Sequence, residues 1–136
     1  VCEARQADAD QALQLGIAIG DTLFYSQIVH YENNVPVQIE DRFVNPETAP
    51  DYLRQVLNKQ TPYTYLMDIA PLTAGEHRVE AISASDEQRH LLQLEEHEPC
   101  LLIHRRTWSG SRVVTSARLI YPGSRYQLFG RFTSHG

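Results

Sequence analysis

The chain has 136 residues, a formal net charge of −5 and a hydrophobic content of 42%, which indicates one globular domain that needs neither a disulfide nor a metal to fold. The acidic balance argues against direct binding of nucleic acid, because domains that bind it usually carry a basic surface. No apolar run approaches the ~20 residues that span a bilayer, so we expect no membrane partner. The cysteines Cys2 and Cys100 show no zinc spacing and favour a reducing, cytoplasmic compartment.

The first half of the chain reads as a helix, a β-hairpin and two short helices. The predicted elements are a helix over 8–15, strands over 22–31 and 35–45 joined by a turn at Asn33-Asn34, a short helix within 46–57 and another helix beginning at Thr61. Asp8 is a good N-cap for the first helix. Thr61 followed by Pro62 is typical of a helix start, with the cap at Thr61 and proline at the first helical position.

The second half repeats this alternation of strand and helix. The predicted elements are a strand over 76–85, an amphipathic helix over 86–94 and strands near 100–108, 112–121 and 126–132. The last two strands are expected to be joined by a tight turn at Pro122-Gly123-Ser124.

An internal similarity relates the two halves. The stretch "QALQLGIAIGDTLFYSQIVHYENNVPVQIEDRFVNP" (11–46) is similar to "RHLLQLEEHEPCLLIHRRTWSGSRVVTSARLIYP" (89–122). Each stretch reads as helix, strand, turn, strand. Two such units predict an α+β domain with one mostly antiparallel sheet flanked by helices and an internal pseudo-two-fold repeat. A cleft at the junction of the units is a natural ligand site.

Polar residues within apolar strand patterns are the candidate binding residues. They are His30, Glu40, Arg42, Thr115, Arg118 and Tyr121. A buried charge must be paired or must meet a ligand, although strand alternation also allows these residues to lie on a solvated face. A two-residue loop at Asn33-Asn34 puts Glu40 opposite Gln27, whereas a three-residue loop puts it opposite Ile28, on the same face as His30.

Other motifs carry less chemistry. Thr61 at a helix start favours an anion there, although an ordinary N-cap is the more common role. His90, His97 and His104 recur every seven residues, a spacing that matches no metal motif, so we expect neither a metal nor a cofactor. No nucleophile elbow and no glycine-rich phosphate loop is present, so an enzyme is unsupported.

Five motifs together resemble a known family. "LGIAIGDTLFY", "NNVPVQIEDRFVNP", "APLTAGEHRVEA", "EPCLLIHRRTW" and "ARLIYPGSRYQLFGRF" are similar to the effector-binding (UTRA) domain of GntR-superfamily repressors, HutC subfamily, in its histidine-utilisation branch. The resemblance implies a chorismate-lyase-like fold over residues 1–136 and a homodimer. It implies urocanate as the effector that releases operator DNA. The DNA would bind a winged helix-turn-helix domain on the N-terminal side, absent from this chain, and the start at Val1 suggests a fragment.

The resemblance also suggests site residues. Phosphosugar-sensing relatives have an Arg-x-Arg pair where this chain has Ile28 and His30, which disfavours a phosphate and favours a smaller, flatter acid. The family's Glu on the returning strand, its Ser or Thr at the start of the middle helix and its late-strand Tyr match Glu40, Thr61 and Tyr121, whereas the family's Glu early in the late strand is replaced by Thr115.

We hypothesise that Thr61 holds the carboxylate of urocanate and that Glu40 or His30 holds its imidazole. Tyr121 and Tyr63 would pack on the ligand and Thr115 would add a hydrogen bond, with Arg42 and Arg118 in reserve. The alternatives are a sensor of another small acid or of a phosphosugar, or a chorismate-lyase-like enzyme.

Overall fold

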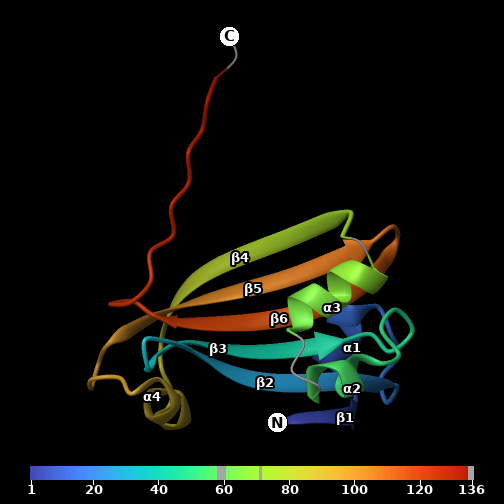
Figure 1. Cartoon of the computed structure of the whole chain (residues 1–136), viewed down its shortest axis with the longest axis horizontal. Helices are drawn as coiled ribbons and strands as arrows, with labels where there is room; N and C mark the ends of the chain where they lie inside the picture. The colour runs from blue at the N-terminus through green and yellow to red at the C-terminus, as the bar shows by residue number, and fades with distance from the viewer. Residues whose placement is uncertain (58–60, 71, 135–136) are drawn as a thin grey trace.

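One antiparallel sheet organises the chain (Figure 1). The structure is a computed structural model that describes residues 1–57, 61–70 and 72–134. Over these residues the strands are β1 (Cys2–Gln6), β2 (Thr22–Glu32), β3 (Val35–Val44), β4 (Ala74–Ser83), β5 (Pro99–Ser109) and β6 (Arg112–Pro122). Their order in the sheet is β1-β2-β3-β6-β5-β4, so the β2–β3 and β5–β6 hairpins meet at the centre. β6 is therefore paired on both of its edges, by β3 and by β5.

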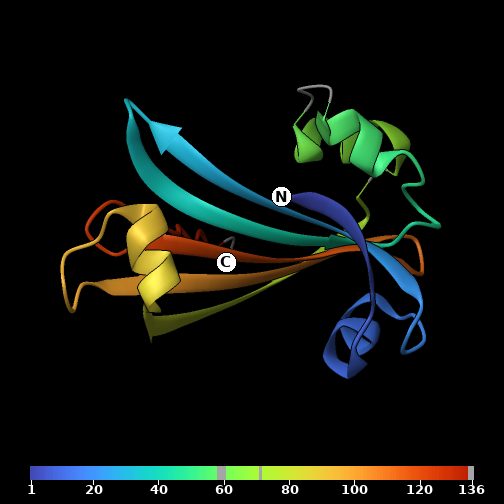
Figure 2. The same ribbon diagram turned by 90° about the horizontal axis from the view of Figure 1, so that it is seen from below.

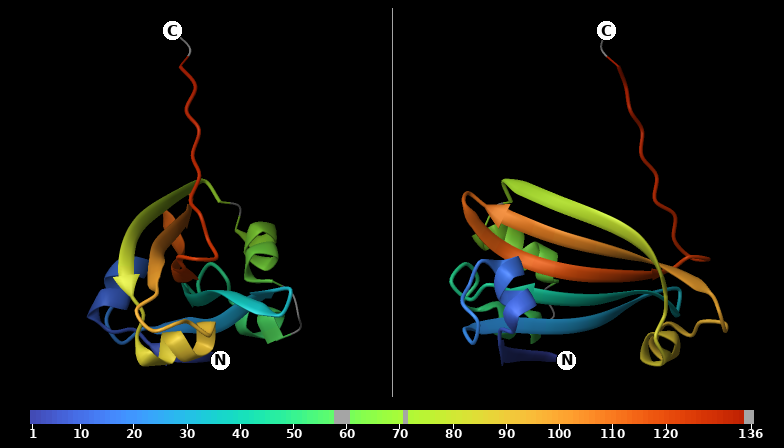
Figure 3. Two further views of the ribbon diagram at one scale, coloured as in Figure 1. Left: turned by 90° about the vertical axis from the view of Figure 1, so that its left-hand side faces the viewer. Right: turned by 180° about the vertical axis from the view of Figure 1, so that it is seen from behind.

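Helices cover both faces of the sheet (Figures 2 and 3). They are α1 (Ala9–Leu15), α2 (Tyr52–Leu57), α3 (Pro62–Ile69) and α4 (Asp86–Leu92). Leu15 of α1 packs with Leu23 and Phe43, and Leu92 of α4 packs with Ile39 and Ile120. On the opposite face, α2 and α3 bury Tyr52 and Leu66 against Val44. The alternation of side chains along β3 explains why different helices pack on the two faces. Residues 39 and 43 point to the face covered by α1 and α4, and residues 40, 42 and 44 point to the face covered by α2 and α3.

The predicted helix caps are confirmed. Asp8 accepts a hydrogen bond from the backbone N–H of Gln11 at 2.8 Å, and the Gln11 side chain accepts one from the N–H of Asp8 at 3.1 Å. Thr61 caps α3 by accepting from the N–H of Thr64 at 3.2 Å. These contacts satisfy amide groups that the first turn of a helix leaves unpaired. Among the described residues, no helix combines the length and apolar character needed to cross a bilayer.

The first hairpin combines the predicted two-residue loop with an unpredicted bulge. Asn33 and Asn34 have φ of 51° and 65°, the left-handed conformation that a type I′ turn requires and that asparagine tolerates. The ladder then slips by one residue, so that His30 pairs with Gln38 while Tyr31 pairs with Pro36. Glu40 consequently lies opposite Ile28. This register was expected for a three-residue loop, and here the bulge supplies the extra residue.

The predicted strand over 126–132 is wrong. After β6 the chain turns at Gly123, whose N–H bonds to the carbonyl of Pro99 at 2.8 Å, and residues 126–134 form neither strand nor helix. A strand needs a partner, and both neighbours of β6 are already occupied. β1 was not predicted, since residues 2–6 lack an apolar alternation and are ordered by pairing with β2. The halves run β1-α1-β2-β3 and β4-α4-β5-β6, and the duplication stays a prediction.

Candidate functional site

The sheet face beneath α3 carries most of the predicted binding residues. The strand registers place His30 beside Gln38, Glu40 beside Leu119 and Val44 beside Thr115. Residues opposite each other in an antiparallel pair point to the same face. His30, Glu40, Arg42, Thr115 and Tyr121 therefore share this face. Arg118 lies between Ala117 and Leu119 on β6 and points to the opposite face.

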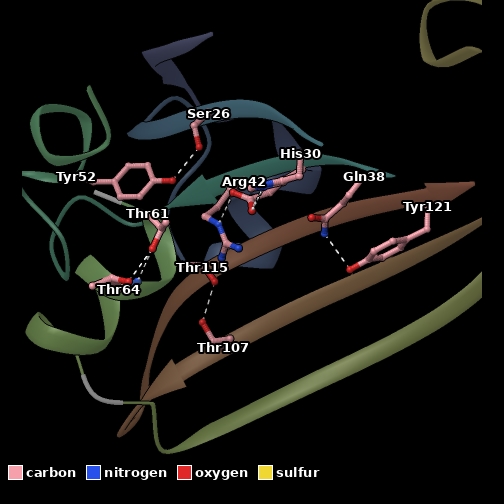
Figure 4. Close-up of polar contacts among 11 residues, drawn as sticks. Ser26, His30, Gln38, Arg42, Tyr52, Thr61, Thr64, Thr107, Thr115 and Tyr121 are labelled. Carbon is pink, nitrogen blue, oxygen red and sulfur yellow. Dashed lines mark hydrogen bonds and ion pairs between the residues drawn. The ribbon is translucent and has the colours of Figure 1, made fainter. Parts of the chain in front are cut away.

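A buried chain of polar contacts runs through Glu40 (Figure 4). His30 Nε2 lies 3.2 Å from Glu40 Oε1, and Arg42 Nε donates to Glu40 Oε2 at 3.1 Å. Burial alone would raise the pKa of Glu40, but the hydrogen bonds from His30 and Arg42 and the charge of Arg42 lower it to about 2. Glu40 is thus an ionised, buried carboxylate that holds one cation and one imidazole in place.

Two arginines flank a small residue in the middle of this face. Ala117 on β6 pairs with Arg42 on one side and with Arg105 of β5 on the other. Strands lie about 4.8 Å apart, so the two arginine backbones are roughly 10 Å apart with only a methyl group between them. Arg105 Nε donates to His77 Nε2 at 2.8 Å, and it forms no ion pair with any carboxylate in the described part of the chain. Partial burial and the charge of Arg105 lower the pKa of His77, which suits a neutral imidazole that accepts this bond.

A cavity of about 50 Å³ lies where these arginines meet α3. Its walls are Arg42, Arg105, Thr107 and Thr115 from the sheet, with Leu66, Met67 and Leu72 above them. The hydroxyl groups of Thr107 and Thr115 are buried and hydrogen-bonded to each other at 2.8 Å. The cavity therefore offers two cations and two hydroxyls against an apolar lid, the composition of a site for a small acid.

The other predicted residues lie around this centre. Thr61 is exposed, and its hydroxyl donates to Thr64 Oγ1 at 2.7 Å, so it acts as a helix cap in this structure. The Tyr63 side chain lies outside the described part of the structure. Tyr121 is six residues from Thr115 along β6, roughly 20 Å away at 3.3 Å per residue. A small acid between Arg42 and Arg105, which flank Ala117, would therefore lie closer to Thr115 than to Tyr121.

Tyr121 closes the far end of this face. Its hydroxyl accepts a hydrogen bond from Gln38 Nε2 at 2.9 Å. Its ring stacks on Tyr126 with centroids 3.8 Å apart, and both tyrosines pack against the buried cluster that includes Leu119. Burial raises the pKa of Tyr121, so the phenol is neutral at physiological pH.

A second, shallower groove lies on the opposite face, beside α1. Two adjoining cavities of about 170 and 130 Å³ share Gln14, Arg78, His104 and Ser116, and Arg118 lines the larger one. Carboxylates already compensate part of this charge, since Arg106 contacts Glu76 at 3.6 Å and His104 contacts Glu80 at 2.9 Å. Although this groove is larger, the cavity beneath α3 combines two arginines with the buried hydroxyl groups of Thr107 and Thr115 under apolar side chains, so we favour that cavity as the candidate site.

Sequence reasoning missed three members of the site. Arg105, Thr107 and Gln38 received no role, although Arg105 and Thr107 alternate with Ile103 along one strand. That spacing of two is the available signal, because it puts their side chains on the same face of β5. Their meeting with Arg42 and Thr115 depends on the pairing of β5 with β6, which the local sequence does not encode.

The amino-acid sequence of the chain matches a known domain family. The family model described as "UTRA domain" matches residues 1–127. The chain belongs to the UTRA family. The predicted resemblance to the UTRA domain is thereby confirmed.

The chain is similar to several histidine utilization repressors. The chain is 61% identical over 127 residues to the histidine utilization repressor of Pseudomonas putida, covering 93% of this chain and 51% of that protein. It is 55% identical over 132 residues to the Klebsiella aerogenes histidine utilization repressor, covering 97% of this chain and 55% of that protein. The chain thus spans about half the length of these relatives.

A solved structure shows the same fold. The C-terminal domain of the histidine utilization repressor from Pseudomonas syringae pv. tomato is 57% identical, with a TM-score of 0.92 over 98% of this chain and 95% of that one. The predicted α+β class with an antiparallel sheet and flanking helices is therefore confirmed. The likeness to chorismate lyase stays a prediction.

Proposed function

We propose that this domain senses urocanate for a repressor of histidine utilisation. The observation that carries the proposal is the pair Arg42 and Arg105, which flank Ala117 in the sheet and both line the cavity beneath α3. The similarity to histidine utilization repressors supports histidine utilisation as the regulated pathway. Urocanate has one carboxylate and one flat imidazole, which the charged and polar groups of this face could bind.

The ligand carboxylate would lie between Arg42 and Arg105, with the hydroxyl groups of Thr107 and Thr115 as further donors. Charge-assisted hydrogen bonds of this kind are roughly twice as strong as neutral ones. The flat ring would extend along β6 toward Leu119. There the Glu40 carboxylate would accept a hydrogen bond from the ligand's imidazole, or the His30 imidazole would donate a hydrogen bond to it or accept one from it. Tyr121 would close that end of the site. Thr61 and Tyr63 remain candidates at the α3 end of the site.

Ligand entry would shift α3. A cavity of about 50 Å³ has room for a few water molecules and is small for urocanate, so α3 with Leu66 and Met67 would move outward. The ligand would then bind the arrangement with α3 displaced more tightly than the arrangement with α3 in place. A ligand can shift a conformational equilibrium only through such a difference in affinity. We further propose that the whole protein is a homodimer whose DNA-binding domain, on the N-terminal side, releases operator DNA when this shift occurs.

The test is a thermal unfolding series of this chain with urocanate, histidine, imidazole propionate and glucosamine 6-phosphate. A ligand at about 100 times its Kd stabilises by roughly 2.7 kcal/mol, which raises the Tm of a domain this size by several degrees. We expect the largest rise with urocanate. A rise with glucosamine 6-phosphate alone would favour a phosphosugar sensor, and no rise with any of the four would contradict the proposal for this domain.

A further inference from the structure

Two arginines and a histidine form a row on the sheet face beside α1. In the strand register, His104 of β5 pairs with Arg78 of β4 on one side and with Arg118 of β6 on the other. Residues opposite each other in antiparallel strands point to the same face, so the three side chains lie side by side and are here called the basic row. Both arginines are exposed, and neither forms an ion pair with a carboxylate of residues 1–57, 61–70 or 72–134.

The carboxylate opposite Arg118 is bound by other groups. Asp41 of β3 pairs with Arg118 of β6 in the strand register. Its Oδ1 atom accepts hydrogen bonds from the Tyr25 hydroxyl at 2.7 Å and from Gln27 Nε2 at 2.9 Å. Both donors come from β2, on the side of β3 away from β6, so the guanidinium group of Arg118 is left to bind another anion.

One exposed carboxylate, Glu80, lies near the basic row. Glu80 Oε1 lies 2.9 Å from His104 Nε2. This hydrogen bond lowers the pKa of Glu80, and the charges of Arg78 and Arg118 lower it further. Glu80 is therefore ionised and lies within the field of both guanidinium groups, although its ion-pair contact is with the imidazole. Two guanidinium groups that share one carboxylate leave a net positive charge, which attracts a second anion.

The basic row lines the larger cavity beside α1, which has a volume of about 170 Å³, against about 50 Å³ for the cavity beneath α3. The cavity is also lined by Phe43 and Ser116 of the sheet and by Gln11 and Gln14 of α1. Asp10, in the first turn of α1, lies in the same lining. The cavity therefore has cations on its sheet side and amide and carboxylate groups on its α1 side. This combination suits an acid that also carries a hydroxyl or amino group.

This cavity and the proposed effector site lie on opposite faces of the same strands. Successive residues of a strand point to opposite faces. His104 therefore points toward α1 and Arg105 toward α3, and Figure 2 shows these two helices on opposite sides of the sheet. In the same way, Arg118 points toward α1 and Ala117 toward α3. The sheet separates the two arginine pairs, so one small ligand cannot touch both.

We propose that the cavity beside α1 is a second ligand site, which binds a small organic acid independently of the effector site. The carboxylate or phosphate group of the acid lies between Arg78 and Arg118. Its hydroxyl or amino group faces Asp10 and the side-chain amides of α1. Charge-assisted hydrogen bonds from the two guanidinium groups supply most of the affinity. This site goes beyond the proposed function and does not rest on the identity of the effector.

The first test titrates the chain with malate, a hydroxy acid, and with inorganic phosphate, with chloride keeping the ionic strength constant. Backbone amide NMR signals of Gln14 and Arg78 report on the cavity, and those of Leu66 and Thr107 report on the effector face. We expect saturable shifts at Gln14 and Arg78 with at least one of the two probes. A response to malate alone would identify a carboxylate ligand, and a response to phosphate alone a phosphate ligand. No saturable shift at Gln14 and Arg78 with either probe would overturn the proposal.

The second test uses four variants and the probe that binds. Arg78→Gln and Arg118→Gln should each raise its Kd at least about tenfold, because each removes a charge-assisted hydrogen bond. Arg54→Gln removes an exposed arginine of α2, is the matched control and should leave the Kd unchanged. Glu80→Gln removes a competing negative charge and should lower the Kd by up to about fivefold. An unchanged Kd in Arg118→Gln, or weaker binding to Glu80→Gln, would overturn the proposal.

Urocanate binding separates this site from the proposed function. We expect Arg118→Gln to bind urocanate as the wild type does, and Arg105→Gln to bind the malate or phosphate probe as the wild type does. A chain that binds the probe but not urocanate would defeat the proposed function and leave the second site standing. Loss of both ligands in Arg118→Gln would show one shared site and would overturn the proposal.

Discussion

Arg42 of β3 and Arg105 of β5 face each other across Ala117, one strand apart on either side. Glu40 holds Arg42 through its Nε, and the imidazole of His77 holds Arg105 through its Nε. Only one carboxylate therefore serves two guanidinium groups. An anion seated over Ala117 would relieve the repulsion between them, which makes this pair the centre of the proposed effector site.

Arg105→Gln should weaken urocanate binding and leave the fold intact. Hydrogen bonds to charged groups contribute about 1.5–3 kcal/mol, so we expect Kd to rise about 10- to 100-fold. Calorimetric titration measures this directly. Arg118→Gln is the matched control, since it removes the same charge from the opposite face. If Arg118→Gln weakens binding and Arg105→Gln does not, the effector binds in the groove beside α1.

Thr115→Val should destabilise the domain more than the double variant T107V/T115V. The single change leaves the buried Thr107 hydroxyl without its partner, which costs about 1–3 kcal/mol. Replacing both hydroxyls by methyl groups removes the unsatisfied group and should restore most of the loss. Urea unfolding of the wild type, the two single variants and the double variant forms a complete cycle. Additive losses would mean that the two hydroxyls do not depend on each other.

Glu40→Gln should flatten the acid dependence of stability. The pKa of Glu40 is lowered from 4.5 to about 2 in the folded chain, so its contribution is complete above pH 4.5 and is lost as the pH falls toward 2. The shift corresponds to about 3 kcal/mol. Urea unfolding from pH 6 to pH 2.5 should show a steeper fall for the wild type than for Glu40→Gln. Parallel curves would show that Glu40 is not ionised by its neighbours in this way.

Arg125→Lys should cost stability although the charge is kept. The guanidinium reaches three carbonyls on two separate segments, Pro36 in β3 and Leu92 and Gln93 at the end of α4, and a single ammonium group cannot match that spread of donors. We expect a loss of about 1–3 kcal/mol in the free energy of unfolding. Arg131→Lys, in the extended segment after β6, is the control and should change stability by less than about 0.5 kcal/mol. Equal effects of the two substitutions would contradict the anchoring role.

Local signals in the sequence sufficed for most elements. The capping residues Asp8 and Thr61 marked helix starts, and the Asn33-Asn34 pair marked a type I′ turn, because these side chains and backbone conformations act within a few residues. The apolar alternation of β2, β3, β5 and β6 likewise depends only on neighbours in the chain. The family, too, was predicted from short motifs, and the matching of residues 1–127 confirmed it.

Only the tertiary structure decided which residues meet. The bulge after Pro36 set the face of Glu40, and the pairing of β5 with β6 brought Arg105 beside Arg42 across Ala117. The segment after Pro122 has strand-forming residues yet forms no strand, since β3 and β5 already occupy both edges of β6. Strand partners come from distant parts of the chain. The sequence of residues 126–132 therefore determined only a tendency to extend, and the tertiary structure decided that this segment does not pair with β6.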